Sequence, residues 1–254
     1  MIRVTKLRIP ALPTEKPRRL YVYTPRGYAK SQRRYPVLYM FDGYNVFYDS
    51  HATYGKSWGM KQFLDRSGFE VIVVAIECNH EGNRRLSEYT PWPFARRPFG
   101  TVEAQGETTM DWLVHELKGR IDAEYRTLPD REHSLIAGSS MGGLMAVYAA
   151  VAYNEYFSRA AALSPCLWLD PGAAREMIRA HPLRSPTRIY LDMGGAEAAG
   201  HPRMISAMFD AAKALSKAGA DVDARVAPGA RHCEADWEKR IPVFFEYLLD
   251  DPTN

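Results

Sequence analysis

Two uninterrupted apolar runs constrain the fold more than any other feature of this sequence. Residues 36–41 (PVLYMF) and 71–76 (VIVVAI) lack the alternation of apolar and hydrophilic side chains. A strand with one face in water shows that alternation, whereas a parallel strand covered on both faces is apolar throughout. Amphipathic stretches separate such runs along the chain. The order predicts an α/β fold, with a mostly parallel central sheet of about eight strands and helices on both faces.

The remaining elements follow the same alternation over the 254 residues, a length that fits a single α/β domain. Met110, Leu113, Val114, Leu117 and Ile121 are spaced to form one face of a helix. Further strands are predicted at residues 3–9 and 19–24, as an antiparallel edge, and at 133–137, 160–163, 188–193 and 222–226. Further helices are predicted at 142–153, around 204–215 and around 237–248.

A glycine–serine motif stands between a predicted strand and a predicted helix. Gly138, Ser140 and Gly142 form the pattern G-x-S-x-G. In a nucleophile elbow, the serine occupies a sharp strand-to-helix turn, and the glycines let the neighbouring backbone pass closely. We predict that Ser140 is a nucleophile, and the alternative is a glycine-rich turn with a capping serine.

The partners of such a serine follow it in the order acid, then histidine. His232 comes after the last predicted strand and before the closing helix, so it is the predicted base; a solvated loop histidine is the alternative. Two carboxylates are candidates for the acid. Asp192 lies inside the strand 188–193, whereas Glu197 lies beyond its end and is free to reach a histidine. We favour Glu197, which could otherwise cap the next helix.

Residues 79–105 do not fit the alternation of strands and helices. The segment is rich in Pro and Arg, shows no helical or strand period, and starts at the carboxyl end of the strand 71–76, where ligands bind in open α/β sheets. It gathers Tyr89, Trp92, Phe94 and Phe99 among four arginines. We predict a rim or lid that suits an aryl or acidic ester. The alternative is a solvent-exposed loop held by its prolines. Within the segment, a pair between Arg85 and Glu88 that fastens the loop would make these two residues structural.

These residues resemble the putative esterase family of α/β hydrolases, which includes siderophore, feruloyl and acetylxylan esterases, S-formylglutathione hydrolase and mycolyltransferases. The resemblance spans residues 19–248 and rests on several separate blocks. They are residues 39–47 (YMFDGYNVF), Arg85 with 88–91 (EYTP), 136–143 (IAGSSMGG), 163–165 (LSP) with Trp168, 194–197 (GGAE), and His232 with Trp237. Ala196, beside a second glycine, departs from the family pattern, in which a polar pair is common.

The resemblance implies an α/β-hydrolase fold and a serine carboxylic ester hydrolase that works through an acyl-enzyme. It also implies an oxyanion hole made by the backbone N–H groups of Tyr44 and Met141. From the same blocks and the 79–105 segment, we expect substrate contacts at Asp42, Asn45, Arg85, Tyr89, Trp92 and Trp168. An acyltransferase with the same triad remains a second interpretation, and a catalytically silent binding module is a third.

Composition argues against other classes. The net charge of +3 is small and scattered, so no nucleic-acid partner is expected. The sequence has three cysteines, Cys78, Cys166 and Cys233, and this odd number does not suggest a disulfide framework. No cysteines or histidines have the spacing of metal ligands, so we expect no metal and no cofactor. The N-terminus lacks the apolar core of a secretion signal, and no apolar run reaches membrane-spanning length. We expect a cytoplasmic protein with a small-molecule ester substrate, no membrane partner, and possible assembly as a homo-oligomer.

Overall fold

The computed structural model describes residues 1–12, 14, 16–199 and 201–249, and the chain forms two compact units, residues 1–135 and 136–254. The strands β1, β2, β4 and β3 belong to the first unit, and β7, which begins at the boundary, belongs with β8, β9 and β10 to the second. These are the eight strands of the main sheet, as the sequence predicts. No helix among the described residues is long and apolar enough to cross a membrane.

The first unit begins with an antiparallel edge. The strand β1 (Ile2–Leu7) pairs with β2 (Arg18–Tyr23), which pairs antiparallel with β4 (Ile72–Ile76), and β4 pairs parallel with β3 (Val37–Met40). The predicted edge is therefore confirmed. The two apolar runs form the parallel pair β3 and β4, and their strand residues are all buried.

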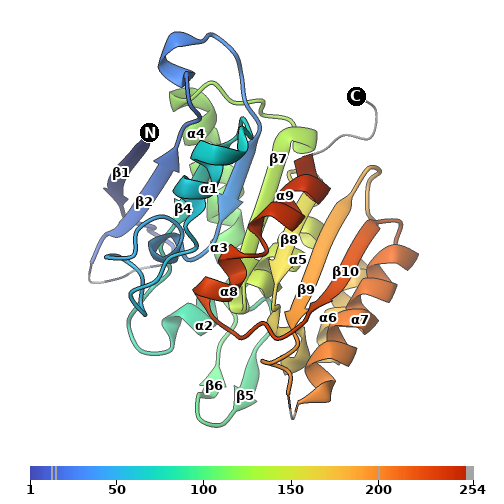
Figure 1. The fold of residues 1–254 in the computed structure, drawn as a ribbon. Helices are drawn as coiled ribbons and strands as arrows, with labels where there is room; N and C mark the ends of the chain where they lie inside the picture. The colour runs from blue at the N-terminus through green and yellow to red at the C-terminus, as the bar shows by residue number, and fades with distance from the viewer. Residues whose placement is uncertain (13, 15, 200, 250–254) are drawn as a thin grey trace. The chain divides into compact units, whose positions relative to one another are not determined.

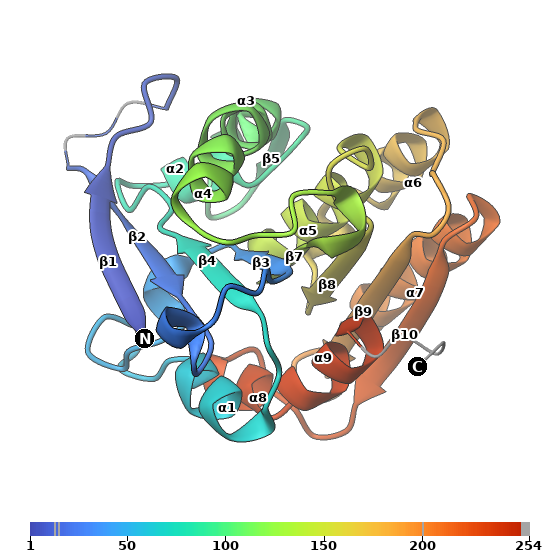
Figure 2. The same cartoon turned by 90° about the horizontal axis from the view of Figure 1, so that it is seen from above.

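Helices cover both faces of this part of the sheet. The helix α1 (Met60–Ser67) lies on one side, and α3 (Gly106–Trp112) and α4 (Lys118–Glu124) lie on the other (Figures 1 and 2). A π-helical turn, Leu113–Leu117, joins α3 to α4. The five apolar residues predicted to share a helix face are all buried, which confirms that prediction.

The segment 79–105 contains more regular structure than its sequence suggests. It includes a short helix, α2 (Arg84–Glu88), and a hairpin of β5 (Phe94–Arg96) with β6 (Gly100–Val102). Elements of three to five residues are too short to produce a readable period in the sequence. The suggested pair of Arg85 with Glu88 is wrong, because Arg85 binds Asp42 and Glu88 binds Arg18.

The second unit is a parallel βα arrangement. The strand β7 (Ser134–Ser139) is followed by β8 (Arg159–Leu163), β9 (Arg188–Gly194) and β10 (Asp221–Ala227), and β9 pairs parallel with both β8 and β10. On one face lie α5 (Met141–Ala152), α6 (Pro171–Ala180) and α7 (Pro202–Lys217), and on the other lies α9 (Ile241–Leu249) (Figure 2).

The end of the chain differs in one detail from the sequence prediction. The single closing helix expected around 237–248 is two helices, α8 (Glu234–Glu238) and α9. Pro242 explains the break, because proline has no N–H to donate to a carbonyl of the preceding turn but is tolerated in the first turn of a helix. The apolar positions Trp237, Ile241 and Phe244 are buried as expected.

Candidate active site

Ser140 occupies a strained turn between β7 and α5. Its φ of 59° and ψ of −121° lie in a region that residues with a side chain rarely adopt. The turn is anchored by hydrogen bonds from Ser140 N to Leu163 O (2.9 Å) and from Cys166 N to Ser140 O (3.1 Å). A Cβ at Gly138 would lie 2.5 Å from Gly142 O, so only glycine fits there. The backbone therefore has the geometry of a strand–turn–helix elbow with Ser140 at its tip.

Glu197 and His232 come from two loops of the same unit and are in contact. Glu197 follows β9, His232 lies between β10 and α8, and a short hydrogen bond joins His232 Nδ1 to Glu197 Oε2. The carboxylate is 2% exposed and the imidazole is 40% exposed. Because an ionised carboxylate only accepts hydrogen bonds, Nδ1 carries the proton and Nε2 is left as the basic nitrogen.

The environment of Glu197 keeps its carboxyl group ionised. Burial raises the pKa of Glu197, but the hydrogen bonds from His232, Ser164 and the Gly194 backbone outweigh it, so that the pKa is lowered overall. Ser164 Oγ and Gly194 N both donate to Oε1 at 2.5 Å. One oxygen of the carboxylate thus accepts hydrogen bonds from Ser164 and Gly194, and the other accepts a hydrogen bond from the imidazole of His232.

Asp192, the competing candidate for the acid, has different partners. It is fully buried in β9, where it accepts hydrogen bonds from Arg240 Nη1 (2.7 Å) and from the Tyr190 hydroxyl (2.9 Å). Burial raises the pKa of Asp192 to about 6, in spite of the opposing charge of Arg240. Of the two carboxylates, Glu197 is therefore the one that lies against His232.

Two further side chains support this pair, and the sequence analysis assigned no role to either. Ser164 is fully buried in a left-handed conformation (φ 49°), donates to Glu197, and accepts a hydrogen bond from Trp237 Nε1 (3.0 Å). The Trp237 ring packs edge-on against His232, with 5.0 Å between the ring centroids. Both residues stand in blocks of the family resemblance, which was the one available signal for them.

The acid and base loops are also tied through their backbones. The carbonyl oxygen of Ala230 accepts hydrogen bonds from Ala196 N (3.0 Å) and Glu197 N (3.2 Å). A Cβ at Gly194 would lie 2.4 Å from that oxygen, so glycine is required for this approach. Since main-chain groups hold the loop, the small side chain of Ala196 is no obstacle to its geometry.

The Ser140 hydroxyl contacts a thiol rather than the imidazole. Its Oγ lies 3.4 Å from Cys166 Sγ, and within the described residues no hydrogen bond joins it to His232. Met141 is buried as the first residue of α5, and the first N–H groups of a helix have no acceptor inside it. Trp168 is half-buried in the 3-10 turn Cys166–Leu169, two residues past that thiol.

In the first unit, four of the predicted site residues form one cluster. Arg85 binds Asp42 with two hydrogen bonds of 2.7 Å, the Tyr89 hydroxyl accepts from Asp42 N (3.1 Å), and the Tyr44 hydroxyl donates to Asp42 Oδ1 (3.2 Å). Asp42 has a φ of 56° and is 5% exposed, and Tyr89 is 1% exposed. These side chains therefore fix the turn that carries the backbone of Tyr44.

The other two predicted contacts in this unit have different surroundings. Asn45 is buried and its side-chain oxygen accepts from Thr53 N (3.1 Å), which fastens the following loop. Trp92 is half-buried, and its backbone oxygen accepts from the Thr90 hydroxyl (2.6 Å). Within the described ranges, no group of three or more His, Cys, Asp or Glu side chains could hold a metal ion.

Comparisons with known proteins place the chain in a family. Residues 13–248 match the family described as Putative esterase. A relative from Bacillus subtilis (strain 168), the uncharacterized protein YbbA, is 24% identical over 183 residues, which are 71% of this chain and 69% of that protein.

Solved structures share the fold. The IroE-like serine hydrolase from Shewanella oneidensis has a TM-score of 0.77 at 19% identity, over 98% of this chain and 79% of that one. The enterobactin esterase FES from Shigella flexneri, solved in the presence of enterobactin, has a TM-score of 0.73 at 17% identity, over 98% of this chain and 58% of that one. The likeness confirms the predicted α/β-hydrolase fold, and the match over nearly the whole length shows that the chain belongs to the Putative esterase family and is an esterase.

Proposed function

We propose that the protein is a serine carboxylic ester hydrolase that works through an acyl-enzyme. Ser140 is the nucleophile, His232 is the general base and acid, and Glu197 orients and stabilises the imidazolium. The observation that carries the proposal is the buried carboxylate of Glu197 on His232 Nδ1, in the same unit as the strained turn at Ser140.

In the acylation step, His232 Nε2 takes the proton of the Ser140 hydroxyl while Oγ attacks the ester carbonyl carbon. The imidazolium then protonates the alcohol oxygen as the ester bond breaks, which leaves the acyl group on Ser140. In the deacylation step, His232 takes a proton from water, the hydroxide attacks the acyl carbon, and the proton returns to Ser140 Oγ. The ionised Glu197 supports both imidazolium states.

The developing oxyanion needs preorganised donors. We assign the first to the N–H of Met141, at the start of α5, where the helix dipole also favours negative charge. We assign the second to the N–H of Tyr44, whose turn is braced by the Asp42–Arg85 pair. Each such donor contributes about 3 kcal/mol in enzymes of this type.

The segment 79–105 is proposed as the rim of the substrate site within a single α/β-hydrolase domain, with Trp92 and Trp168 as apolar contacts. We infer a small-molecule ester as substrate, without nucleic-acid or membrane partners. The cysteines Cys78, Cys166 and Cys233 are free thiols, and this supports a reducing compartment such as the cytoplasm.

The decisive experiment replaces Ser140 and uses the neighbouring serine as its control. Ser140→Ala is expected to lower turnover of p-nitrophenyl acetate by several orders of magnitude, and Ser139→Ala to retain it, because only Ser140 stands at the elbow. A fluorophosphonate probe followed by peptide mass mapping should label Ser140 alone. A folded Ser140→Ala protein with near wild-type turnover would refute the proposal.

A further inference from the structure

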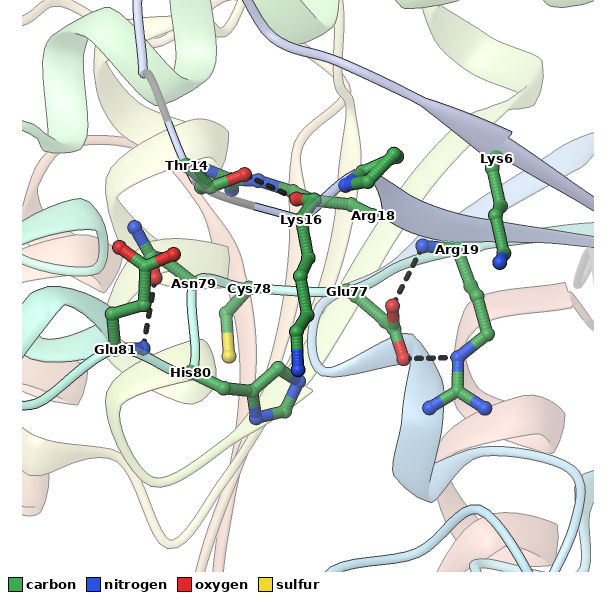
Figure 3. Close-up of a pocket in the computed structure, with 11 residues that line it drawn as sticks. Lys6, Thr14, Lys16, Arg18, Arg19, Glu77, Cys78, Asn79, His80 and Glu81 are labelled. Atoms are coloured by element: carbon green, nitrogen blue, oxygen red, sulfur yellow. Dashed lines mark hydrogen bonds and ion pairs between the residues drawn. The ribbon is translucent and has the colours of Figure 1, made fainter.

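A cavity of about 690 Å³ lies in the first unit, at the edge of the sheet where β1 and β4 end and β2 begins. Because β1, β3 and β4 run in the same direction, this is the carboxyl edge of the parallel strands, where ligands bind in α/β folds. Figure 3 shows the side chains that surround it. Most of the residues that line it have charged or polar side chains: Lys6, Thr14, Lys16, Arg18, Arg19, Glu77, Asn79, His80 and Glu81.

Most charges of this lining are already neutralised. Arg19 forms two hydrogen bonds of 2.6 Å with Glu77, one from its backbone N and one from Nε. Arg18 is buried and binds both oxygens of Glu88, at 2.7 and 2.5 Å. These pairs shape the wall and contribute little net charge.

The remaining charged side chains of the lining are Glu81, whose carboxylate lies 3.8 Å from Arg84 Nε, and two lysines. Lys6, near the end of β1, and Lys16, just before β2, are exposed, and no ion pair with another described residue engages either of them. In Figure 3 the Lys16 side chain extends across the cavity toward the His80 ring. Among the described residues of the lining, the charged side chains without an ion pair are therefore these two lysines.

The same cavity adjoins the turn that carries Tyr44. The His80 ring, part of the lining, packs edge-on against the Tyr44 ring at 4.5 Å between centroids, and the Cys78 thiol of the lining lies 4.0 Å from the Tyr44 hydroxyl. A group bound in the cavity would thus lie one side chain away from the residue assigned to the oxyanion hole.

We propose that this cavity binds a carboxylate carried by the ester substrate, and that Lys6 and Lys16 provide its charge recognition. The inference rests on the proposed function, because it assigns a subsite to that same reaction. It makes the preferred substrate a half-ester of a dicarboxylic acid, or an ester whose alcohol portion bears a carboxylate.

The test compares charged esters with neutral counterparts of the same skeleton. For a charge on the acyl portion, the pair is p-nitrophenyl hydrogen succinate and its methyl ester. For a charge on the alcohol portion, the pair is meta-acetoxybenzoate and its methyl ester. We expect the wild-type protein to show the lower KM for the charged member of at least one pair, with the preference shrinking as salt is added.

Single variants identify the source of that preference. Lys6→Gln and Lys16→Gln are each expected to raise KM for the charged ester about fivefold, the upper range for an exposed ion pair, and to leave kcat and the neutral ester unchanged. Lys16→Arg should retain the preference. The matched control is Lys30→Gln, which removes an exposed lysine of the same unit outside the cavity.

The proposal is overturned if neither charged ester is preferred, or if the cavity variants raise its KM no more than Lys30→Gln does. Labelling of Ser140 and hydrolysis of the neutral esters are measured on the same samples. If labelling and neutral-ester hydrolysis are retained but the preference for the charged ester is absent, the assignment of the carboxylate subsite is wrong and the proposed function stands. If Ser140→Ala remains active, the proposed function itself fails.

Discussion

Replacing the buried carboxylate beside His232 gives the sharpest test of the site's electrostatics. Glu197→Gln preserves the shape of the side chain, and its amide oxygen can still accept from Ser164 and Gly194. The amide nitrogen would then face His232 Nδ1, and two N–H donors cannot pair. The imidazole would have to adopt the other tautomer, with the proton on Nε2, and could not take a proton from Ser140.

The size of the effect follows from that change of tautomer. The corresponding Asp-to-Asn change in serine proteases lowers kcat about 10⁴-fold, which corresponds to about 5.5 kcal/mol. Glu197 is 2% exposed, so water cannot replace the lost acceptor. We expect a loss of roughly 10³- to 10⁴-fold in kcat with little change in KM, since the carboxylate is directed at His232 rather than at the substrate.

The assay is hydrolysis of p-nitrophenyl acetate, with each sample normalised by circular dichroism and thermal unfolding to its folded fraction. Asp192→Asn is the matched control, because it makes the same neutralisation in a buried carboxylate that binds Arg240 instead of the histidine. Its kcat should remain within about tenfold of wild type. The reverse ranking of the two folded variants would refute the assignment of the acid.

Three further outcomes are expected. Ser164→Ala removes one donor to Glu197 and the acceptor of the Trp237 N–H, so kcat should fall about tenfold, or about 1.4 kcal/mol, at unchanged KM, as measured by steady-state kinetics. Trp92→Ala should change kcat/KM for bulky aryl esters about tenfold and that for acetate esters little; equal effects on both would contradict a rim role for residues 79–105. Burial raises the pKa of Asp192 to about 6, so its stabilising contribution is complete below the ordinary aspartate pKa of about 4 and is lost as pH rises through 6. Urea unfolding of Asp192→Asn should therefore show a flatter pH dependence between about pH 4 and 6 than wild type.

The elements that depend on local sequence could be predicted. Continuous apolar runs identified β3 and β4, and the 3.6-residue period identified the helix face that includes Met110 and Ile121. The position of Glu197 beyond the end of β9 favoured it over Asp192, because a side chain inside a strand is fixed by the pleat. These inferences needed no knowledge of distant contacts.

What escaped prediction depends on contacts between residues far apart in the sequence. Ser164 bridges Glu197 and Trp237, which lie 33 and 73 positions away, and no local pattern encodes such a bridge. Arg85 and Glu88 lie close together in the sequence and were expected to pair within the loop, but Arg85 binds Asp42 and Glu88 binds Arg18, both far away in the sequence. A buried charge needs an opposite charge close to it, because that partner offsets the cost of removing the charge from water. The spacing of residues along the sequence does not indicate which partner the fold brings near.

The shared acceptor at Ala230 has a consequence for how the site can move. Its carbonyl oxygen accepts hydrogen bonds from two consecutive backbone N–H groups, those of Ala196 and Glu197. The loop that carries the acid and the loop that carries the base are therefore coupled mechanically. Slow hydrogen exchange at these two amides is the observable sign of such coupling. Movement of the base loop should therefore carry the acid loop with it, so that the pair of Glu197 and His232 is kept while its distance from Ser140 changes. Insertions in either loop would disturb both residues at once, so variation in loop length among functional relatives should occur outside residues 194–198 and 230–232.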